Sequence, residues 1–195
     1  TDRRRRIKVL DCTIRDGGIC NNWHFDHSEV KNVFQKLDSA GVEYMEIGYL
    51  TSPGFFDPKL VGPWRFCARE DLRKILEPSN LKISVMVDVG RINTEDIPPS
   101  SESGIDVIRI ATYAHQMDEA LRILSHCLDN GYETFMNVMA VSTLKPEEVD
   151  AFLLRLKGSG VHNVAIVDSF GALFPYHVRY LVRKYSKFLL QHLLK

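Results

Sequence analysis

The stretch Asp11-Cys12-Thr13-Ile14-Arg15-Asp16-Gly17-Gly18 follows the first apolar segment of the chain, residues 7–12, which we predict to be a strand. It places an arginine, a carboxylate and two glycines at the end of that strand. In parallel α/β proteins the residues that carry chemistry gather at the carboxyl ends of the strands. A fixed cation beside a carboxylate able to bind a metal suits a substrate that must become an enolate, so this stretch is the first candidate site.

Five further apolar segments follow along the chain, and amphipathic helical patterns separate them. They lie at residues 43–49, 82–89, 107–113, 134–141 and 163–168. Several lack polar alternation, as is typical of strands that are buried on both faces. Six successive βα units predict a parallel sheet with right-handed crossovers. No linker interrupts the pattern, so residues 1–195 are expected to form a single domain.

Helix boundaries are marked by caps and helix-breaking residues. Asp26 with Glu29 resembles a capping pair, and Gly41 ends the helix that this pair begins. Pro146 and Pro175 open later helices. The second and third connections are rich in proline, and only residues 68–76 indicate a helix there. Aromatic residues are frequent in the loops that follow the predicted strands, and we expect them to form core packing or an apolar wall around a site. They are Trp23, Phe55, Phe56, Trp64 and Phe66.

Two architectures fit this order of elements. One is a doubly wound open sheet, and the other is a (β/α)₈ barrel, which needs eight strands and about 250 residues. No G-x-G-x-x-G fingerprint opens the first helix. In addition, a loop and not a helix is expected directly after Asp16-Gly17-Gly18. The pattern therefore disfavours a dinucleotide-binding protein.

Composition excludes several classes of partner. The 195 residues carry 25 Lys and Arg against 25 Asp and Glu, so the net charge is zero and neither nucleic acid nor a membrane surface is an expected partner. The arginine run at residues 3–6 is expected to be a solvated terminus, with a targeting or polyanion-binding patch as the alternative.

No apolar stretch reaches the roughly 20 residues that span a bilayer. The scattered Cys12, Cys20, Cys67 and Cys127 show no CxxC spacing and predict a reducing, cytoplasmic location.

With Asn21-Asn22-Trp23 behind it, the opening stretch resembles the start of the DRE-TIM metallolyases, above all their aldolase catalytic domains. The likeness continues in order through Glu46-Ile47-Gly48, Arg109-Ile110-Ala111-Thr112 and Asp168-Ser169-Phe170-Gly171. This superfamily includes 4-hydroxy-2-oxovalerate aldolase, HMG-CoA lyase, and the isopropylmalate and homocitrate synthases. The resemblance implies a (β/α)₈ TIM barrel, of which this chain holds about six βα units.

The resemblance also implies a missing element. The family carries a metal-binding His-x-His pair on its seventh strand, and this chain has none. We expect either a fragment of a longer protein or a natural truncation before that strand. A shortened barrel would expose the edges of its first and sixth strands, which a partner or a second copy of the chain could cover, so a homo-oligomer is one expectation.

Three residues take roles that the resemblance implies. Asp16 matches the metal-binding aspartate, with a turn residue as its alternative. Arg15 matches the catalytic arginine that holds the keto oxygen and stabilises the enolate, with a structural ion pair as its alternative. Ser169 matches a position that binds the substrate carboxylate, with a helix or turn cap as its alternative.

Charged residues on the predicted strands give further candidates. Glu46 and Arg109 are expected to point into the barrel, where a buried charge needs a partner. We favour a salt bridge among these buried charges, in which Arg109 pairs with Glu46, Asp88 or Asp168. The functional interpretation gives Glu46 a catalytic role beside Arg15, and Arg109 a role in substrate binding. Asp11 and Asp168 are expected to support the residues that contact the substrate or metal.

The chain departs from the family pattern at Ile19. The resemblance implies a catalytic histidine at this position in the bacterial aldolases and a glutamine in the synthases. Isoleucine can neither take a proton nor donate a hydrogen bond. Nearby substitutes for the missing base are His24, Asp26, His27 and Cys20. For the two histidines we favour a solvated helix start over this role.

These residues together predict a carbon–carbon lyase or aldolase that acts on a small 2-oxo acid. The resemblance implies a divalent cofactor, Mg²⁺ or Mn²⁺, with Zn²⁺ or Co²⁺ as alternatives. A Claisen-type acyl-CoA synthase is the alternative within the enzymes. A non-catalytic remnant that serves as an interaction module is the alternative outside them, and by itself the present chain is expected to be inactive.

Overall fold

The computed structural model describes residues 7–189; the arginine run at residues 3–6 and the end of the last predicted helix lie outside them. All neighbouring strands of the sheet are parallel, and the strand order is β1-β2-β3-β4-β5-β6. The strands are β1 (Leu10–Asp11), β2 (Tyr44–Tyr49), β3 (Lys82–Asp88), β4 (Val107–Thr112), β5 (Glu133–Val138) and β6 (Asn163–Ile166). The six predicted strands are therefore confirmed, although β1 is shorter than predicted.

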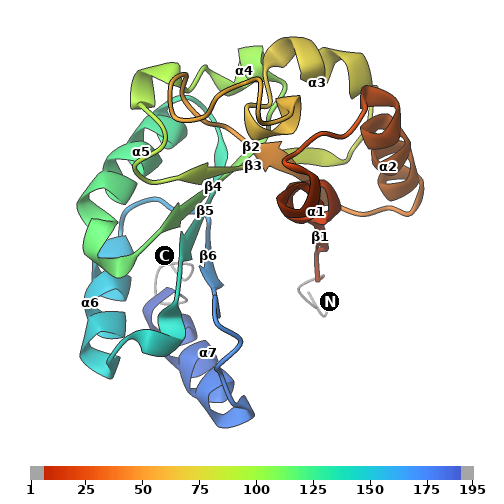
Figure 1. The fold of residues 1–195 in the computed structure, drawn as a ribbon. Coiled ribbons are helices and arrows are strands. Elements are labelled where there is room, and N and C mark those ends of the chain that lie inside the picture. The colour runs from red at the N-terminus through yellow and green to blue at the C-terminus, as the bar shows by residue number, and fades with distance from the viewer. Residues whose placement is uncertain (1–6, 190–195) are drawn as a thin grey trace.

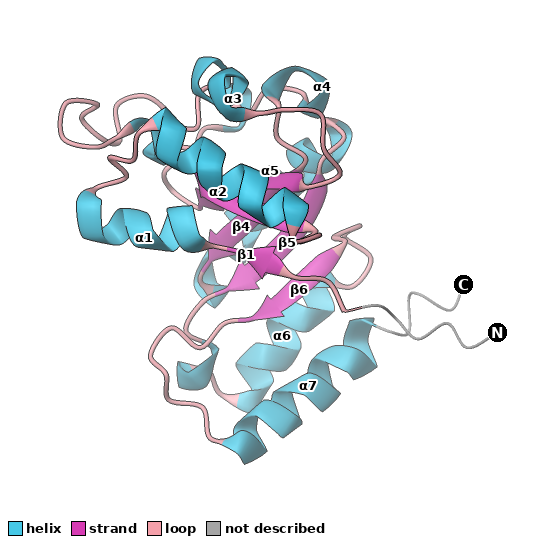
Figure 2. Cartoon of the chain, turned by 90° about the vertical axis from the view of Figure 1, so that its right-hand side faces the viewer, coloured by secondary structure: helices cyan, strands magenta, loops and turns pink. Residues whose placement is uncertain are grey.

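Helices connect the strands. They are α1 (Thr13–Asn21), α2 (His27–Ser39), α3 (Arg69–Ile75), α4 (Ser100–Ser103), α5 (Met117–Asp129), α6 (Pro146–Leu156) and α7 (Pro175–Leu189). The sheet curls, the helices α2, α3, α5 and α6 lie along its outer side, and the curl is open between β1 and β6 (Figure 1). Figure 2 shows α6 and α7 beneath β6, while α1 and α2 lie near β1.

The sequential strand order decides between the two predicted architectures. A doubly wound sheet reverses direction at a switch point and places helices on both faces. Here the order never reverses and the sheet curls towards closure, as in a (β/α)₈ barrel. The structure is therefore a partial TIM barrel, as the resemblance implied.

The two faces of the curled sheet differ in composition. The convex face buries aliphatic side chains beneath the helices, among them Met45, Ile47, Val85, Ile108 and Ile110. The concave face carries a smaller apolar group, in which Tyr49, Met86 and Ala111 pack with Trp23 and Met139. Buried polar residues, including Glu46 and Ser84, interrupt the apolar strands. Both faces of the central strands are covered, which explains why their sequences lack simple alternation.

The opening stretch of the sequence folds differently from its prediction. A loop was expected after Asp16-Gly17-Gly18, but both glycines lie inside α1. The side chain of Asp11 accepts hydrogen bonds from the backbone nitrogen of Thr13 at 3.0 Å and from its hydroxyl at 2.9 Å, where α1 begins. A Cβ on Gly18 would lie 2.0 Å from Cδ1 of Trp23. Close packing against this indole, rather than a turn, requires the second glycine.

Other predicted boundaries are confirmed. Asp26 and Glu29 form the capping box at the start of α2. Gly41 follows that helix with a φ of +72°. Pro146 and Pro175 open α6 and α7. No helix within residues 7–189 combines the length and the apolar character needed to cross a membrane.

The glycine pair in α1 gives a test of this packing. We expect Gly18→Ala to lower the free energy of unfolding by about 2 kcal/mol, because overpacking a filled site typically costs 1–3 kcal/mol. Gly17→Ala is the matched control, since its Cβ would meet only the ring edge of Phe25, at 3.2 Å. Urea denaturation of both variants measures the difference, and equal unfolding midpoints would contradict the packing argument.

Candidate functional site

A single buried carboxylate organises the carboxyl ends of the first strands. Glu46 lies on β2 and is 0% exposed. Its Oε1 accepts a hydrogen bond from Nε of Arg15 at 2.6 Å, and its Oε2 accepts one from Nη1 of Arg109 at 2.6 Å. The predicted salt bridge between Glu46 and Arg109 is confirmed, and Arg15 shares the same carboxylate. The three residues come from α1, β2 and β4, so they join segments far apart in the sequence.

This ion pair fixes the charge of Arg15. Burial alone lowers the pKa of its guanidinium, but the charge and the hydrogen bond of Glu46 outweigh burial and hold the pKa above its ordinary value. The side chain is 15% exposed. Arg15 is therefore a permanent, oriented cation with limited access to solvent, which is the property that an enolate-stabilising group requires.

Asp16 lies at the outer side of this cluster. Its side chain is 59% exposed, and its Oδ1 accepts a hydrogen bond from Nη1 of Arg15. Among the described residues, no group of three or more His, Cys, Asp or Glu side chains is arranged to hold a metal. Asp16 thus offers one oxygen ligand that is already paired with a cation, so the described residues alone do not fit a divalent ion.

The remaining predicted site residues accept hydrogen bonds from backbone nitrogens. The pKa of Asp168 is lowered mainly because its carboxylate accepts a hydrogen bond from the backbone nitrogen of Leu173, at 2.8 Å. Oγ of Ser169 accepts one from the backbone nitrogen of Ala140 at 2.9 Å. Asp11 contacts the start of α1 and not Arg15 itself. The expected salt bridge of Asp168 with Arg109 does not form, because the Asp168 carboxylate accepts hydrogen bonds from the backbone nitrogens of residues 172 and 173. Roles of these three residues in substrate or metal binding stay predictions.

The two histidines considered as substitutes for a base contact groups other than Glu46. Ile19 is 63% exposed on α1. Nε2 of His24 contacts the carbonyl oxygen of Leu60 at 3.3 Å, and Nε2 of His27 lies 2.8 Å from Oδ1 of Asp71. Both histidines flank the start of α2, as the favoured interpretation predicted.

Cys12 lies between the two arginines. Nη1 of Arg109 lies 3.8 Å from its Sγ. Burial and the negative charge of Glu46 raise the pKa of the thiol to about 11, against the opposing charges of Arg109 and Arg15. At neutral pH this sulfur is therefore mostly a neutral thiol, which is the less reactive form.

Sequence reasoning missed a second buried arginine. Arg65 is 2% exposed, and its Cζ lies 3.8 Å from the ring centroid of Tyr49 and 4.2 Å from that of Phe56. Its Nη2 donates to Oδ2 of Asp88 at 3.0 Å. The available signal was the arginine between two aromatic residues of the loop, Trp64 and Phe66.

Of the loop aromatics expected to form core packing or an apolar wall, Trp64 is fully buried in the core, whereas Trp23 and the strand residue Tyr49 form a small wall between Arg15 and Arg65. Nε1 of Trp23 donates to the carbonyl oxygen of Arg15 at 3.0 Å, and the Trp23 ring meets the Tyr49 ring edge-on at 5.5 Å. Tyr49 in turn stacks on Arg65. The wall therefore positions α1 as well as shielding the concave face.

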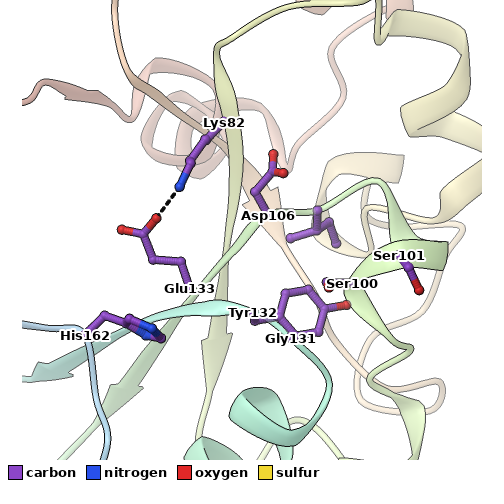
Figure 3. A pocket seen from close by; sticks show the side chains of 9 residues that line it. Lys82, Ser100, Ser101, Asp106, Gly131, Tyr132, Glu133 and His162 are labelled. Atoms are coloured by element: carbon purple, nitrogen blue, oxygen red, sulfur yellow. Dashed lines mark hydrogen bonds and ion pairs between the residues drawn. The ribbon is translucent and has the colours of Figure 1, made fainter.

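A further depression lies at the opposite end of the strands. It measures about 540 Å³, and Lys82, Asp106, Glu133 and His162 contribute to its lining (Figure 3). Lys82 and Glu133 form an ion pair of 2.6 Å across it. These residues belong to the amino ends of β3 to β6, far along the strands from Arg15, so the depression is separate from the candidate site.

The buried carboxylate gives the first test of the site. Glu46→Gln leaves two arginines without their shared counter-charge, and breaking a buried pair costs about 3–5 kcal/mol. We expect a loss of that size in the free energy of unfolding, measured in urea. Glu119→Gln is the control, because Glu119 pairs with Arg122 on an exposed helix face and its loss changes stability little. A Glu46→Gln variant as stable as this control would contradict the assigned burial.

Thiol reactivity gives a second test. A pKa of about 11 leaves about one Cys12 thiol in a thousand ionised at pH 8. Iodoacetamide at pH 8 should therefore modify the exposed Cys20 first and spare Cys12, as peptide mass spectrometry can resolve. Raising the pH towards 11 should increase the labelling of Cys12, whereas rapid labelling at pH 8 would contradict the assigned environment.

No model of a described protein family matches the chain. Among curated proteins, the 4-hydroxy-2-oxovalerate aldolase 6 of Rhodococcus jostii is 26% identical over 177 residues, which cover 89% of this chain and 49% of that protein. The oxaloacetate decarboxylase of Mycobacterium tuberculosis is 25% identical over 182 residues, which cover 92% of this chain and 53% of that protein. The chain thus spans about half the length of these relatives.

Solved structures agree with this similarity. The N-terminal domain of a Bacteroides vulgatus protein assigned as an aldolase superposes with a TM-score of 0.79 and 28% identity, covering 93% of this chain and 60% of that one. The carboxyl transferase domain of Rhizobium etli pyruvate carboxylase superposes with a TM-score of 0.70 at 15% identity, covering 95% of this chain and 34% of that one. The second likeness concerns the fold alone.

Proposed function

Because the chain is a partial barrel of the DRE-TIM metallolyase superfamily, with aldolases and a decarboxylase as its relatives, we propose that it belongs to a carbon–carbon lyase acting on a 2-oxo acid. One observation carries the proposal: the fully buried Glu46 holds Arg15 as an oriented cation at the carboxyl end of the sheet. Sites of catalysis in parallel barrels occupy this end.

The chemistry follows from what a guanidinium can bind. Arg15 donates hydrogen bonds to the keto oxygen of the 2-oxo acid. When the carbon–carbon bond breaks, its electron pair moves onto that oxygen as an enolate, and the fixed positive charge stabilises it. In an aldol cleavage the carbon two positions from the keto carbon bears a hydroxyl group, which gives its proton to water, and this carbon leaves as an aldehyde. In a decarboxylation a carboxylate at the same position leaves as carbon dioxide. Protonation of the enolate carbon then completes either reaction.

The surrounding residues serve this step without contacting the leaving group. Glu46 positions Arg15 and keeps its charge in place. Trp23 and Tyr49 cover one side of the cluster and exclude water, which strengthens the electrostatic contacts inside. Arg109, the second cation on Glu46, contributes positive charge on the concave face and is proposed to help bind the substrate.

A divalent ion, Mg²⁺ or Mn²⁺, remains part of the proposal as a cofactor that Asp16 would help to hold. Such an ion prefers several oxygen ligands. Among the described residues, Asp16 supplies one oxygen-bearing side chain at the cluster, so we assign no step to the metal.

Ile19 favours a second candidate function. An exposed isoleucine stands where the resemblance implies a proton-transferring residue, and this suits a barrel that binds without catalysing. The two candidates differ in one measurable property, which is exchange of the methyl protons of pyruvate through the enolate.

The test is therefore proton exchange of pyruvate in deuterated water, followed by NMR in the complete protein with and without added Mg²⁺ or Mn²⁺. We expect exchange above the solvent rate, and Arg15→Met should slow it about 100-fold or more, as loss of an oxyanion-binding donor does. Arg122→Met, which removes an exposed arginine of α5, is the matched control and should exchange at the wild-type rate.

Exchange no faster than in buffer would favour the non-catalytic barrel. Equal exchange in wild type and Arg15→Met would remove Arg15 from the mechanism. Release of a thiol from an acyl-CoA in the presence of a 2-oxo acid would instead identify a Claisen-type synthase.

A further inference from the structure

A second carboxylate shared by two arginines lies beside the first. Oδ2 of Asp88, at the carboxyl end of β3, accepts hydrogen bonds from Nη2 of Arg65 at 3.0 Å and from Nη1 of Arg91 at 3.1 Å. Glu46 on the neighbouring strand β2 is also shared by two arginines, and it uses one oxygen for each of them. Adjacent strands thus carry two similar charged clusters on the same side of the sheet.

Tyr49 lies between the clusters. Its ring stacks on Arg65. Burial and the charge of Asp88 raise the pKa of Tyr49, while the charges of Arg15 and Arg65 oppose that rise. Direct contacts also join the clusters: Trp23 donates to the carbonyl oxygen of Arg15 at 3.0 Å, its ring meets that of Tyr49 at 5.5 Å, and Tyr49 stacks on Arg65 at 3.8 Å. The two clusters are therefore neighbours that share one aromatic ring.

The two clusters differ in charge. Arg15 and Arg109 are balanced by Glu46 and Asp16, so the first cluster is neutral overall. In the second cluster, Asp88 balances only one of its two arginines. That cluster carries one surplus positive charge among the described residues.

Arg91 is the part of the second cluster that a ligand can reach. Its side chain is 54% exposed, whereas that of Arg65 is 2% exposed. Asp88 uses one of its N–H donors, and its Cζ lies 5.5 Å from the ring centroid of Phe56. The guanidinium is thus held in place with donors left over, which is the arrangement that binds a carboxylate through two parallel hydrogen bonds.

Arg65 supports this arrangement from below. Its Nε is buried and has no hydrogen-bond partner, so its orientation is set by the stacked rings and by Asp88. A buried arginine that holds Asp88 in turn fixes the acceptor on which Arg91 rests.

We propose that the cluster of Arg65, Asp88 and Arg91 binds a second carboxylate of the substrate, so that the substrate is a 2-oxo dicarboxylic acid and Arg91 determines this specificity. The inference rests on the proposed function, because the 2-oxo end of the ligand is assigned to Arg15. The second carboxylate of the substrate neutralises the surplus positive charge of the cluster at Arg91. A methyl group at the same position leaves that surplus charge without a counter-charge.

Matched pairs of 2-oxo acids test the inference in the complete protein. Each pair differs by a carboxylate in place of a terminal methyl group: oxaloacetate with 2-oxobutyrate, 2-oxoglutarate with 2-oxovalerate, and 2-oxoadipate with 2-oxohexanoate. We expect the wild type to bind the dicarboxylate of at least one pair about 10-fold or more tighter, because its terminal carboxylate accepts charge-assisted hydrogen bonds that a methyl group cannot accept.

Arg91→Met should remove this preference and leave the affinity for the monocarboxylate within about twofold. Arg122→Met is the matched control, because Arg122 is also an exposed arginine paired with an acid three residues before it. This variant should keep the wild-type preference. Calorimetric dissociation constants, with a thermal unfolding curve for each variant, separate a lost contact from a misfolded protein.

The outcomes distinguish this inference from the proposed function. No preference in any pair, or a preference that persists in Arg91→Met, overturns the second carboxylate site while leaving Arg15 and the lyase chemistry intact. Arg15→Met should weaken both members of a pair equally. If it weakens neither, the proposed function fails, and a preference lost in Arg91→Met would still establish the anion site.

Discussion

The site depends on one ion pair network, in which the buried carboxylate of Glu46 receives a guanidinium from each side. Removing a carboxylate from water is expensive, and only close, well-aligned partners offset that cost. The network therefore specifies how α1, β2 and β4 sit relative to one another. It also holds Arg15 in its charged form and in a fixed direction, which is what the proposed enolate chemistry requires of it.

Most of the fold was accessible from sequence because apolar segments and helix caps are local signals. Asp26 with Glu29 and the prolines at 146 and 175 marked helix starts that the structure retains. The ion pair of Glu46 and Arg109 was also accessible, since charged residues within apolar strands require each other. These inferences needed only the chemistry of the residues and their periodicity.

The conformation of the opening stretch was not accessible in this way. Two adjacent glycines usually indicate a turn, and here the deciding factor is an indole five residues further along that packs on Gly18. Arg65 escaped notice for the same reason: its role arises from Tyr49, Phe56 and Asp88, which lie on three different segments. Contacts between distant segments override local preference, and a single sequence does not reveal them.

The short pairing of β1 has a consequence for the order in which the molecule unfolds. Within the described residues, β1 pairs with β2 through Leu10 and Asp11, and one more backbone hydrogen bond runs from Tyr44 to Val9. The attachment of α1 therefore depends strongly on side chains: the arginine on Glu46, the indole of Trp23 and the buried Ile14. Regions with few backbone hydrogen bonds open more readily than the strands at the centre of a sheet. Warming or mild denaturant should therefore release this N-terminal segment as a separate cooperative unit and disassemble the Arg15–Glu46 contact while β2 to β5 remain folded.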